Sequence, residues 1–254
     1  MLIRPLSGFY GPVIPALDAI NPVHYQTLTH WVESRKFDAQ LHPTLVEDLL
    51  LMPGEHDARK FSKRHSASWR SDWPLIKAST IRLGVAYFCI DRVGAAFNQR
   101  PLVSELARSG ISEPMALDLI SRGRELATGP RVCILAGSSV PASAINRRLR
   151  LVNKRFDGQW VLMHWRGRGS NMLVHDWALA SGLPVLYTGV PDQRSSGPGA
   201  KDLRDAADFY WVFDQKNAKR AERTISELRS ANKSVEVVYW QHDATNDLFA
   251  AEAT

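Results

Sequence analysis

The chain has 254 residues, of which 44% are hydrophobic and 23% charged, a balance typical of globular proteins with enough apolar material for two domains. No segment approaches the roughly 20 apolar residues of a membrane span, and the first residues lack an apolar run of signal-peptide length. We therefore expect a cytoplasmic protein with no membrane partner. The net charge of +6 favours an anionic partner, either a small nucleotide or a nucleic acid.

The first half of the chain has a mainly helical pattern. Residues 25–36 and 73–91 carry apolar side chains at helical spacing. Between them lies EHDARKFSKRHSASWR (residues 55–70), a charged segment typical of a solvated connection. We expect a mainly helical domain over residues 1–129.

Short polar motifs follow one another along this half. They are Ser7-Gly8-Phe9, Thr27-Leu28-Thr29-His30 with Lys36-Phe37, Arg70-Ser71-Asp72-Trp73 with Lys77, Leu106 with Ser109-Gly110, and Glu113 with Asp118. In this order the motifs resemble those of the NADAR family, whose members cleave N-glycosidic bonds of ribosylated bases or amines. The resemblance covers about 115 residues and implies a ligand derived from NAD or ADP-ribose.

The resemblance implies catalytic positions at Trp73, Asp118 and Thr29. Cleavage of an N-riboside needs a carboxylate near the anomeric carbon and a group that protonates the departing amine. Thr29 stands where the family has a glutamate, and a threonine hydroxyl does not act as a base at neutral pH. Because losing one positioned acid or base costs about 10²–10⁴ in rate, we expect binding with slow turnover. Substrate contacts are implied for His30, Lys36, Arg70, Asp72, Lys77 and Glu113.

Each of these residues also has a purely structural interpretation. Trp73 alone suits a core position, Asp118 on a helix suits the surface, and His30 suits a packed histidine with satisfied hydrogen bonds. In addition, LVSELARSGISEPMALDLI (residues 102–120) fits a DNA-binding helix-turn-helix, with Ala107, Gly110 and Ile111 at its turn.

The second half alternates strands with helices. Strands are predicted at residues 131–137, 160–165, 183–190, 207–214 and 234–240. Helices are predicted through Ile145, Leu149, Val152 and Phe156, from residue 171 to a stop at Gly182, around Leu203, and through Ala221, Ile225 and Leu228. Such alternation predicts a parallel sheet with right-handed crossovers. We expect an α/β chain overall, with a Rossmann-like domain over residues 130–242 and a C-terminal tail over 243–254.

Glycine-containing loops follow the first two of these strands, where ligands of parallel sheets bind. Glycine lets backbone N–H groups approach an anion, and a helix N-terminus with nearby arginines favours negative charge. The alternative is that the glycines only make tight turns. The candidate nucleotide-binding residues are Gly137, Ser138, Ser139, Arg166, Gly167, Arg168, Gly169, Ser170, Asn171 and Gly197.

The order of these loops resembles the SLOG superfamily, in the branch found in phage and plasmid proteins. The resemblance rests on Gly137-Ser138, Arg168-Gly169, Gly197-Pro198 and Ala207-Asp208, over about 110 residues. It implies a Rossmann-like fold that holds a nucleotide. The chain departs from the family pattern at Ser139, in place of arginine, and at Asn171, in place of aspartate.

Together the two halves predict a protein that binds an NAD- or ADP-ribose-derived nucleotide and hydrolyses an N-glycosidic bond. One alternative is a catalytically silent nucleotide sensor. Another is a DNA-binding protein whose basic run follows a phosphate backbone, although the run also suits a solvated helix face. That run consists of Arg147, Arg148, Arg150, Lys154 and Arg155.

The cysteines and histidines predict neither a disulfide nor a metal site. Cys89 and Cys133 lie among apolar neighbours, a context typical of buried free thiols. His164 and His175 have no cysteine or acidic partner at metal-ligand spacing. We therefore expect no metal and no required cofactor.

Overall fold

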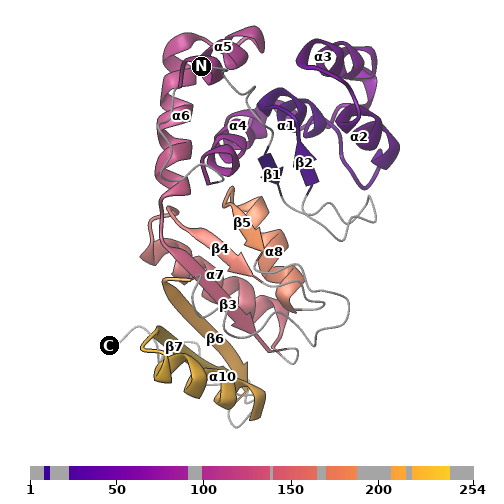
Figure 1. Ribbon diagram of the computed structural model, residues 1–254. Helices are drawn as coiled ribbons and strands as arrows, with labels where there is room; N and C mark the ends of the chain where they lie inside the picture. The colour runs from indigo at the N-terminus through magenta and orange to yellow at the C-terminus, as the bar shows by residue number, and fades with distance from the viewer. Residues whose placement is uncertain are drawn as a thin grey trace. The chain divides into compact units, whose positions relative to one another are not determined.

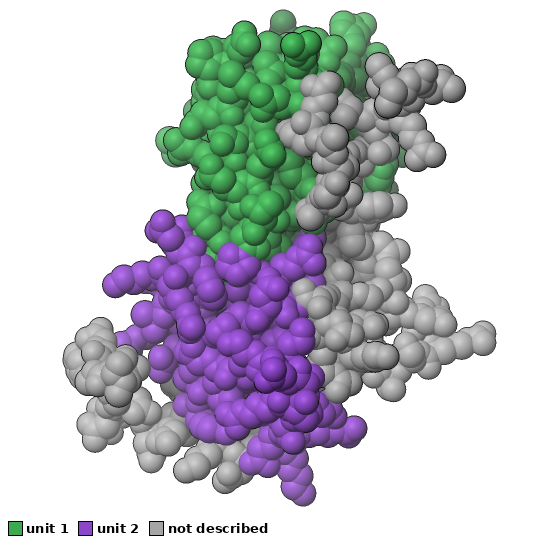
Figure 2. Space-filling view, turned by 60° about the vertical axis from the view of Figure 1, so that its left-hand side comes forward, with its two compact units in different colours: residues 1–129, 159–161, 179–185 green, residues 130–158, 162–178, 186–254 purple. Residues whose placement is uncertain are grey.

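The computed structural model describes residues 9–11, 23–90, 99–137, 140–164, 170–187, 207–215 and 219–240. The chain forms two compact units, which Figure 2 shows in two colours. The first unit comprises residues 1–129, 159–161 and 179–185, and the second comprises residues 130–158, 162–178 and 186–254. Helices and a parallel sheet both occur, so the chain is α/β overall.

Helices make up most of the described part of residues 1–129 (Figure 1). They are α1 (Leu28–Ser34), α2 (Pro43–Leu50), α3 (Glu55–Arg64), α4 (Trp73–Ile90), α5 (Arg100–Arg108) and α6 (Glu113–Ala127). Strands β1 (Phe9–Gly11) and β2 (Val23–Tyr25) form an antiparallel pair. Helix α1 begins after Thr27, whose hydroxyl accepts the N–H of His30 and so caps the helix. The helices predicted within residues 25–36 and 73–91 are confirmed as α1 and α4.

The prediction of a charged connection at residues 55–70 is wrong for its first ten residues, which form α3. Ala58 and Ser62 of this helix are buried, and Ala58 packs with Phe37, Val46 and Leu49. Acidic residues in the first turn and basic residues in the last complement the helix dipole. The apolar stripe of α3 is narrow, so the hydrophobic pattern of this charged segment does not predict a helix. The helix is stabilised by packing of its buried face.

Small residues let the long helices approach closely. A side chain at Gly123 of α6 would place its Cβ 2.6 Å from Val85 Cγ1 of α4, well inside van der Waals contact. Likewise, a Cβ at Gly84 would lie 2.5 Å from the Trp31 ring. The Trp31 indole N–H donates to the carbonyl of Thr80 at 2.8 Å, which fixes the ring against α4.

The five predicted strands of the second half form one parallel sheet in the order β5-β4-β3-β6-β7. The strands are β3 (Arg131–Ala136), β4 (Val161–His164), β5 (Val185–Tyr187), β6 (Phe209–Gln215) and β7 (Ser234–Trp240). The register pairs Val132 with Phe209, and Phe209 with Ser234. The expectation of a parallel sheet is therefore confirmed.

The helices of this half are α7 (Ala142–Arg155), α8 (Ser170–Ala180) and α10 (Lys219–Ser230). Phe156, which ends α7, packs on Phe209 of β6, whereas α10 packs on Val212 of the same strand. Because side chains alternate along a strand, Phe209 and Val212 point to opposite faces. Helices α7 and α10 therefore cover opposite faces of the sheet, as in a doubly wound fold.

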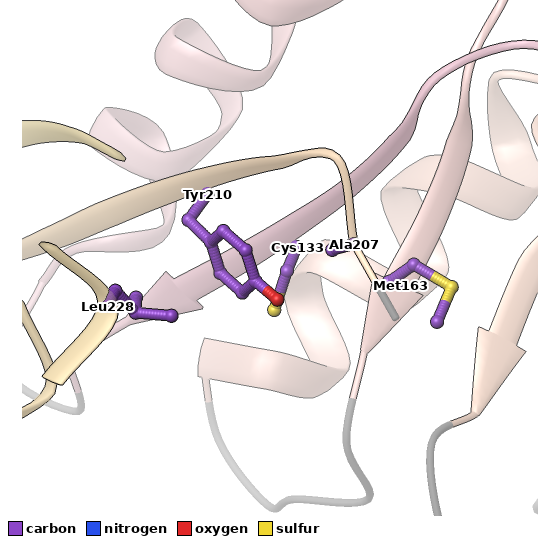
Figure 3. Close-up of a cluster of buried hydrophobic side chains, with 5 residues drawn as sticks. All are labelled: Cys133, Met163, Ala207, Tyr210 and Leu228. Atoms are coloured by element: carbon purple, nitrogen blue, oxygen red, sulfur yellow. The ribbon is translucent and has the colours of Figure 1, made fainter. Parts of the chain in front are cut away.

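Figure 3 shows part of the core beneath the sheet, where Tyr210 and Cys133 of adjacent strands lie beside Leu228, with Met163 and Ala207 completing the cluster. Burial raises the pKa of the Cys133 thiol to about 12. Both cysteines are buried and free, as expected. The stop predicted at Gly182 is also found, because α8 ends at Ala180 and Gly182 has a φ of +72°.

Candidate functional site

A buried carboxyl group lies beside Thr29. Glu105 of α5 is 4% exposed, and its Oε1 accepts the backbone N–H of Thr29 at 2.5 Å. Burial raises the pKa of Glu105, the charge of Glu55 raises it further, and hydrogen bonds from Thr29 and Thr27 oppose the shift. Arg59 of α3 donates to the Thr29 hydroxyl at 3.4 Å. A carboxyl therefore lies next to the position where the family resemblance requires one, although Thr29 itself carries none.

Glu105 was not singled out from the sequence. A signal for it exists, because Leu102, Glu105 and Leu106 fall on one face of α5 and all three are buried. An acidic residue in the apolar stripe of a helix is rarely buried without a partner or a role. Here its partner is the first turn of α1.

His30 is held by protein atoms on both ring nitrogens. Its Nδ1 lies 2.9 Å from the Thr27 hydroxyl and its Nε2 lies 3.0 Å from the carbonyl of Met52. A carbonyl only accepts, so Nε2 carries the proton in this bond. Burial lowers the pKa of His30, which keeps the ring neutral. This arrangement matches the structural interpretation of His30 as a packed histidine.

A second cluster of predicted site residues lies just beyond the C-terminus of α1. Lys36 Nζ lies 2.6 Å from Glu33 Oε2, 4.4 Å from the centre of the Trp69 ring and 5.9 Å from that of Trp73. The Lys36 carbonyl also accepts the N–H of Arg70 at 2.7 Å. The structure thus brings together Lys36, Arg70 and Trp73, three predicted site residues, and adds Trp69, which the sequence did not indicate.

Arg70 also binds Asp72, a further predicted substrate contact. Arg70 Nε and Nη2 donate to the two Asp72 carboxylate oxygens at 2.6 and 2.8 Å. The hydrogen bond from Arg70 lowers the pKa of Asp72, and the same bond raises the pKa of Arg70. The Asp72 carbonyl accepts the N–H groups of Leu75 and Ile76 in the first turn of α4. Lys77, one turn further, is half-buried.

Asp118 lies apart from both clusters. It is exposed and accepts a hydrogen bond from Arg122 Nε, one turn further along α6, at 3.0 Å. The buried face of α6 includes Ala116, Ile120 and Gly123, and Asp118 falls on the other side of the helix at 100° per residue. Within the described residues, no hydrogen bond or ion pair joins Asp118 to Thr29 or Trp73. Glu113, in the first turn of α6, is also exposed.

Thr29 and Trp73 themselves belong to different clusters. Thr29 lies in the first turn of α1, whereas Lys36, which reaches Trp73, lies just beyond the last turn. At 1.5 Å per residue these ends are about 10 Å apart along the helix. The cluster of Lys36, Trp69 and Trp73 therefore lies near the end of α1 opposite to Thr29.

The sheet has its own candidate site at the carboxyl ends of β3 and β6. β3 is central, with β4 on one side and β6 on the other, and this reversal of strand order marks where ligands of such sheets bind. Gly137 directly follows β3 and donates its N–H to the carbonyl of Phe213 at 2.8 Å. That donor was expected to approach an anion, and it is engaged within the sheet instead.

A carboxylate occupies the space above Gly137. A Cβ built on Gly137 would collide with Oδ1 and Cγ of Asp214, so any other residue here would have to displace this carboxylate. Asp214 is near the end of β6 and is half-buried. In the sequence, Asp214 is marked as an acidic residue directly after the apolar run FYWVF. The sequence alone does not predict that the strand of Asp214 lies next to the strand that ends before Gly137.

The other predicted nucleotide-binding residues cannot be placed. Ser138, Ser139, Arg166, Gly167, Arg168, Gly169 and Gly197 lie outside the described residues. The helix predicted around Leu203 also lies outside them. Ser170 and Asn171 form the start of α8, and their side chains are not described.

The basic run lies on α7. Arg147, Arg150 and Lys154 are exposed at helical spacing and share one face. Arg155 is engaged elsewhere, with its Nη1 2.5 Å from Glu236 Oε2 and its guanidinium 4.5 Å from the Phe209 ring centre. The exposed cations Arg147, Arg150 and Lys154 thus form a stripe along α7.

The segment that fits a DNA-binding helix-turn-helix forms two helices joined by a turn, and its use in DNA binding stays a prediction. Helices α5 and α6 are joined by a turn in which Gly110 has a φ of +76°. In known motifs the second helix reads the major groove with its first residues. Here those residues include the exposed Glu113, Met115 and Asp118, and the exposed Arg122 and Arg124 follow on the same helix.

Comparison with protein-family models gives no match, and no curated protein matches the sequence. Among the described residues, no three or more His, Cys, Asp and Glu side chains group in a way that could hold a metal ion. None of the helices in the described part of the chain combines the length and the apolar character needed to cross a bilayer.

Proposed function

We propose that the chain binds an NAD- or ADP-ribose-derived nucleotide at the carboxyl edge of its parallel sheet. The observation that supports this most is the strand order β5-β4-β3-β6-β7. The strand order reverses beside the central strand β3, and ligands of doubly wound sheets bind at the carboxyl ends of the strands at such a reversal. Gly137 at this point lets the Asp214 carboxylate pack closely against the end of β3. The loop resemblance to SLOG proteins points to the same edge.

Thermal unfolding in the presence of candidate ligands tests this proposal. The probes are NAD, ADP-ribose, AMP, a ribosylated base and a single-stranded oligonucleotide. A ligand at 100 times its Kd stabilises the protein by about 2.7 kcal/mol, and this stabilisation raises Tm by a readily measured amount. We expect ADP-ribose or NAD to give the largest shift. Stabilisation by the oligonucleotide alone would contradict the proposal and favour nucleic-acid binding.

A second function, hydrolysis of an N-glycosidic bond, is proposed for the first unit. The observation that favours it is the buried Glu105 carboxyl beside Thr29. A carboxyl whose pKa is raised toward neutrality is suited to donate a proton to a leaving amine. The motifs that resemble the NADAR family supply a basic and aromatic cluster, Lys36 with Trp69 and Trp73, for the ribose or base. Asp118 has no part in this proposal because it is exposed on the far side of α6.

Release of free base from a ribosylated substrate, followed by chromatography, tests this second function. We expect slow release that requires Glu105. Binding of the same substrate with no release would contradict hydrolysis and favour a catalytically silent sensor.

A further inference from the structure

The Thr27 hydroxyl lies between two acceptors that compete for its single proton. Its Oγ1 is 2.9 Å from Nδ1 of His30, and the same side chain makes a hydrogen bond with the Glu105 carboxyl. Nε2 of His30 donates to the Met52 carbonyl, so Nδ1 of the neutral ring has no proton and accepts from Thr27. A hydroxyl donates one proton, so Thr27 cannot donate to His30 and to Glu105 at once.

The protonation state of Glu105 decides which acceptor Thr27 serves. A protonated Glu105 can itself donate to Oγ1 of Thr27, which leaves the hydroxyl proton for His30. An ionised Glu105 only accepts, and a hydrogen bond from Thr27 then stabilises its charge. Oγ1 accepts the backbone N–H of His30 at 3.3 Å through its lone pairs, so the hydroxyl can turn while the cap of α1 is kept.

The charge that acts on this group comes from α3. Glu55 acts on both His30 and Glu105, and it pairs with Arg59 of its own helix and with Arg108 of α5. The charged side chains of α2 and α6, which pack on α1 and α5, are exposed. The other buried or half-buried charged groups on α1, α3 and α4 are Glu33, which pairs with Lys36 just after α1, and Asp57, Lys77 and Arg82. Removal of the Glu55 charge should therefore shift both groups in the same direction.

We propose that Thr27 is a positioning residue for Glu105, with a hydroxyl that donates to His30 while Glu105 is protonated and turns to Glu105 when that carboxyl loses its proton. As a statement about catalysis, this inference rests on the N-glycoside hydrolysis proposed above. Glu105 passes its proton to the departing amine as the C–N bond breaks, and Thr27 keeps its own proton and stabilises the new carboxylate. The water oxygen binds the anomeric carbon, and the proton that this water releases returns to Glu105.

Nuclear magnetic resonance of the isotope-labelled full chain tests the inference without any substrate. The carboxyl carbon of Glu105 reports its ionisation, and the two ring nitrogens of His30 report their hydrogen bonds separately. We expect the Nδ1 resonance to shift with the same midpoint as the Glu105 carbon, while Nε2 keeps its proton. Movement of both nitrogens together at that midpoint, or of neither, overturns the inference, because the hydroxyl would then not turn.

Matched variants identify the hydroxyl as the group that turns. Thr27→Ser keeps the hydroxyl and the cap and should behave as wild type does. Thr27→Val removes the donor, so the midpoint of Glu105 should move to higher pH and the response at Nδ1 should be lost. A response that persists in Thr27→Val overturns the inference.

Two further variants separate competition for the proton from charge. His30→Gln retains an N–H donor for the Met52 carbonyl but lacks the acceptor at Nδ1, so the midpoint of Glu105 should move to lower pH. Glu55→Gln should lower both midpoints while the Nδ1 response remains. An unmoved Glu105 midpoint in His30→Gln overturns the competition, and this variant together with wild type decides the case if Thr27→Val fails to fold.

The outcomes also separate this inference from the proposed hydrolysis. Release of base that requires Glu105, with no Nδ1 response, overturns the role of Thr27 and leaves hydrolysis intact. An Nδ1 response without any release of base overturns hydrolysis and the catalytic role of Thr27, and leaves the turn of its hydroxyl. Where base is released, the pH at which the rate falls should move to higher values in Thr27→Val, and an unmoved pH profile overturns the positioning role.

Discussion

The side chain of Glu105 accepts the backbone N–H of Thr29 at 2.5 Å, although the two residues are 76 positions apart in the chain. The contact joins α5 to the first turn of α1 and places a buried carboxyl beside a threonine that the family resemblance marks as a lost glutamate. Whether Glu105 serves only as a cap for α1 or also in proton transfer can be decided by moving the carboxyl between the two positions.

Removing the carboxyl of Glu105 should lower the rate of N-glycoside hydrolysis, and placing a carboxyl at position 29 should restore part of it. Glu105→Gln keeps the shape of the side chain and removes its acid, and we expect the rate to fall about 10²–10⁴-fold. The double variant Thr29→Glu/Glu105→Gln returns a carboxyl to the neighbouring position in the first turn of α1 and should recover about 10²-fold of this loss. Glu47→Gln, at an exposed position of α2, is the matched control and should leave the rate unchanged.

The single variant Thr29→Glu separates the two interpretations of the site. If Glu105 is the working carboxyl, a second one beside it brings like-charge repulsion and no gain in rate. A rise of about 10²-fold with Thr29→Glu alone would show that wild type lacks the acid and that Glu105 is only structural.

Trp73 should contribute to ligand binding through its ring and not only through its bulk. Trp73→Leu retains an apolar side chain at this 8% exposed position but removes the aromatic face near Lys36. We expect the affinity for a ribosylated substrate to weaken by about 1–3 kcal/mol, the usual value of base–aromatic stacking. Trp73→Phe should keep most of that affinity. If both variants bind as wild type does while Tm falls, Trp73 is a core residue.

The buried Glu105 also predicts how stability depends on pH. Its folded pKa is raised above the ordinary 4.5, so the folded state holds its proton more tightly than the unfolded state. This contribution is complete below about pH 4.5 and is lost as the pH rises through the folded pKa. We expect urea unfolding from pH 4 to 8 to show a smaller decline for Glu105→Gln than for wild type. Parallel pH profiles would contradict the assignment.

The contact between α4 and α6 should not tolerate a side chain at Gly123. In Gly123→Ala the new Cβ would lie 2.6 Å from Val85 Cγ1, and overpacking of this kind costs about 1–3 kcal/mol. In the double variant Gly123→Ala/Val85→Ala the loss should be smaller than the sum of the two single losses, because the contact with Val85 Cγ1 is removed. Val85 Cβ at 2.7 Å and the Arg82 carbonyl oxygen at 3.0 Å remain close to the new Cβ. Additive losses in the double variant, measured by chemical denaturation, would show that the helices do not meet at this point.

Nucleic-acid binding, if it occurs, should depend on one face of α7. Replacing Arg147, Arg150 and Lys154 with alanine removes three exposed cations. The slope of log K against log salt for a single-stranded oligonucleotide should then fall by about 2, at roughly 0.7 per phosphate contact. Alanine at Lys60, Lys63 and Arg64, exposed on α3, is the control with equal charge change. Equal effects of both triple variants would indicate nonspecific attraction by net charge.

The sequence by itself predicted the local elements wherever their hydrophobic patterns were strong. The alternation of apolar strands and periodic helices from residue 131 to 240 predicted all five strands and their parallel arrangement, because a buried strand needs a continuous apolar run. It also predicted α1, α4 and the stop at Gly182. It missed α3, since a charged helix with a narrow buried stripe looks like a solvated segment until its packing partners are known.

Only the tertiary structure decided which polar residues share a site. Glu105 meets Thr29, and Asp214 meets Gly137, through contacts between elements that lie 76 or more positions apart. The family resemblance implied that Asp118 lies with Trp73, but the orientation of α6 turns Asp118 to solvent. The physical reason is that periodicity specifies which face of an element is buried, whereas the partner of a buried polar group depends on which element packs against that face.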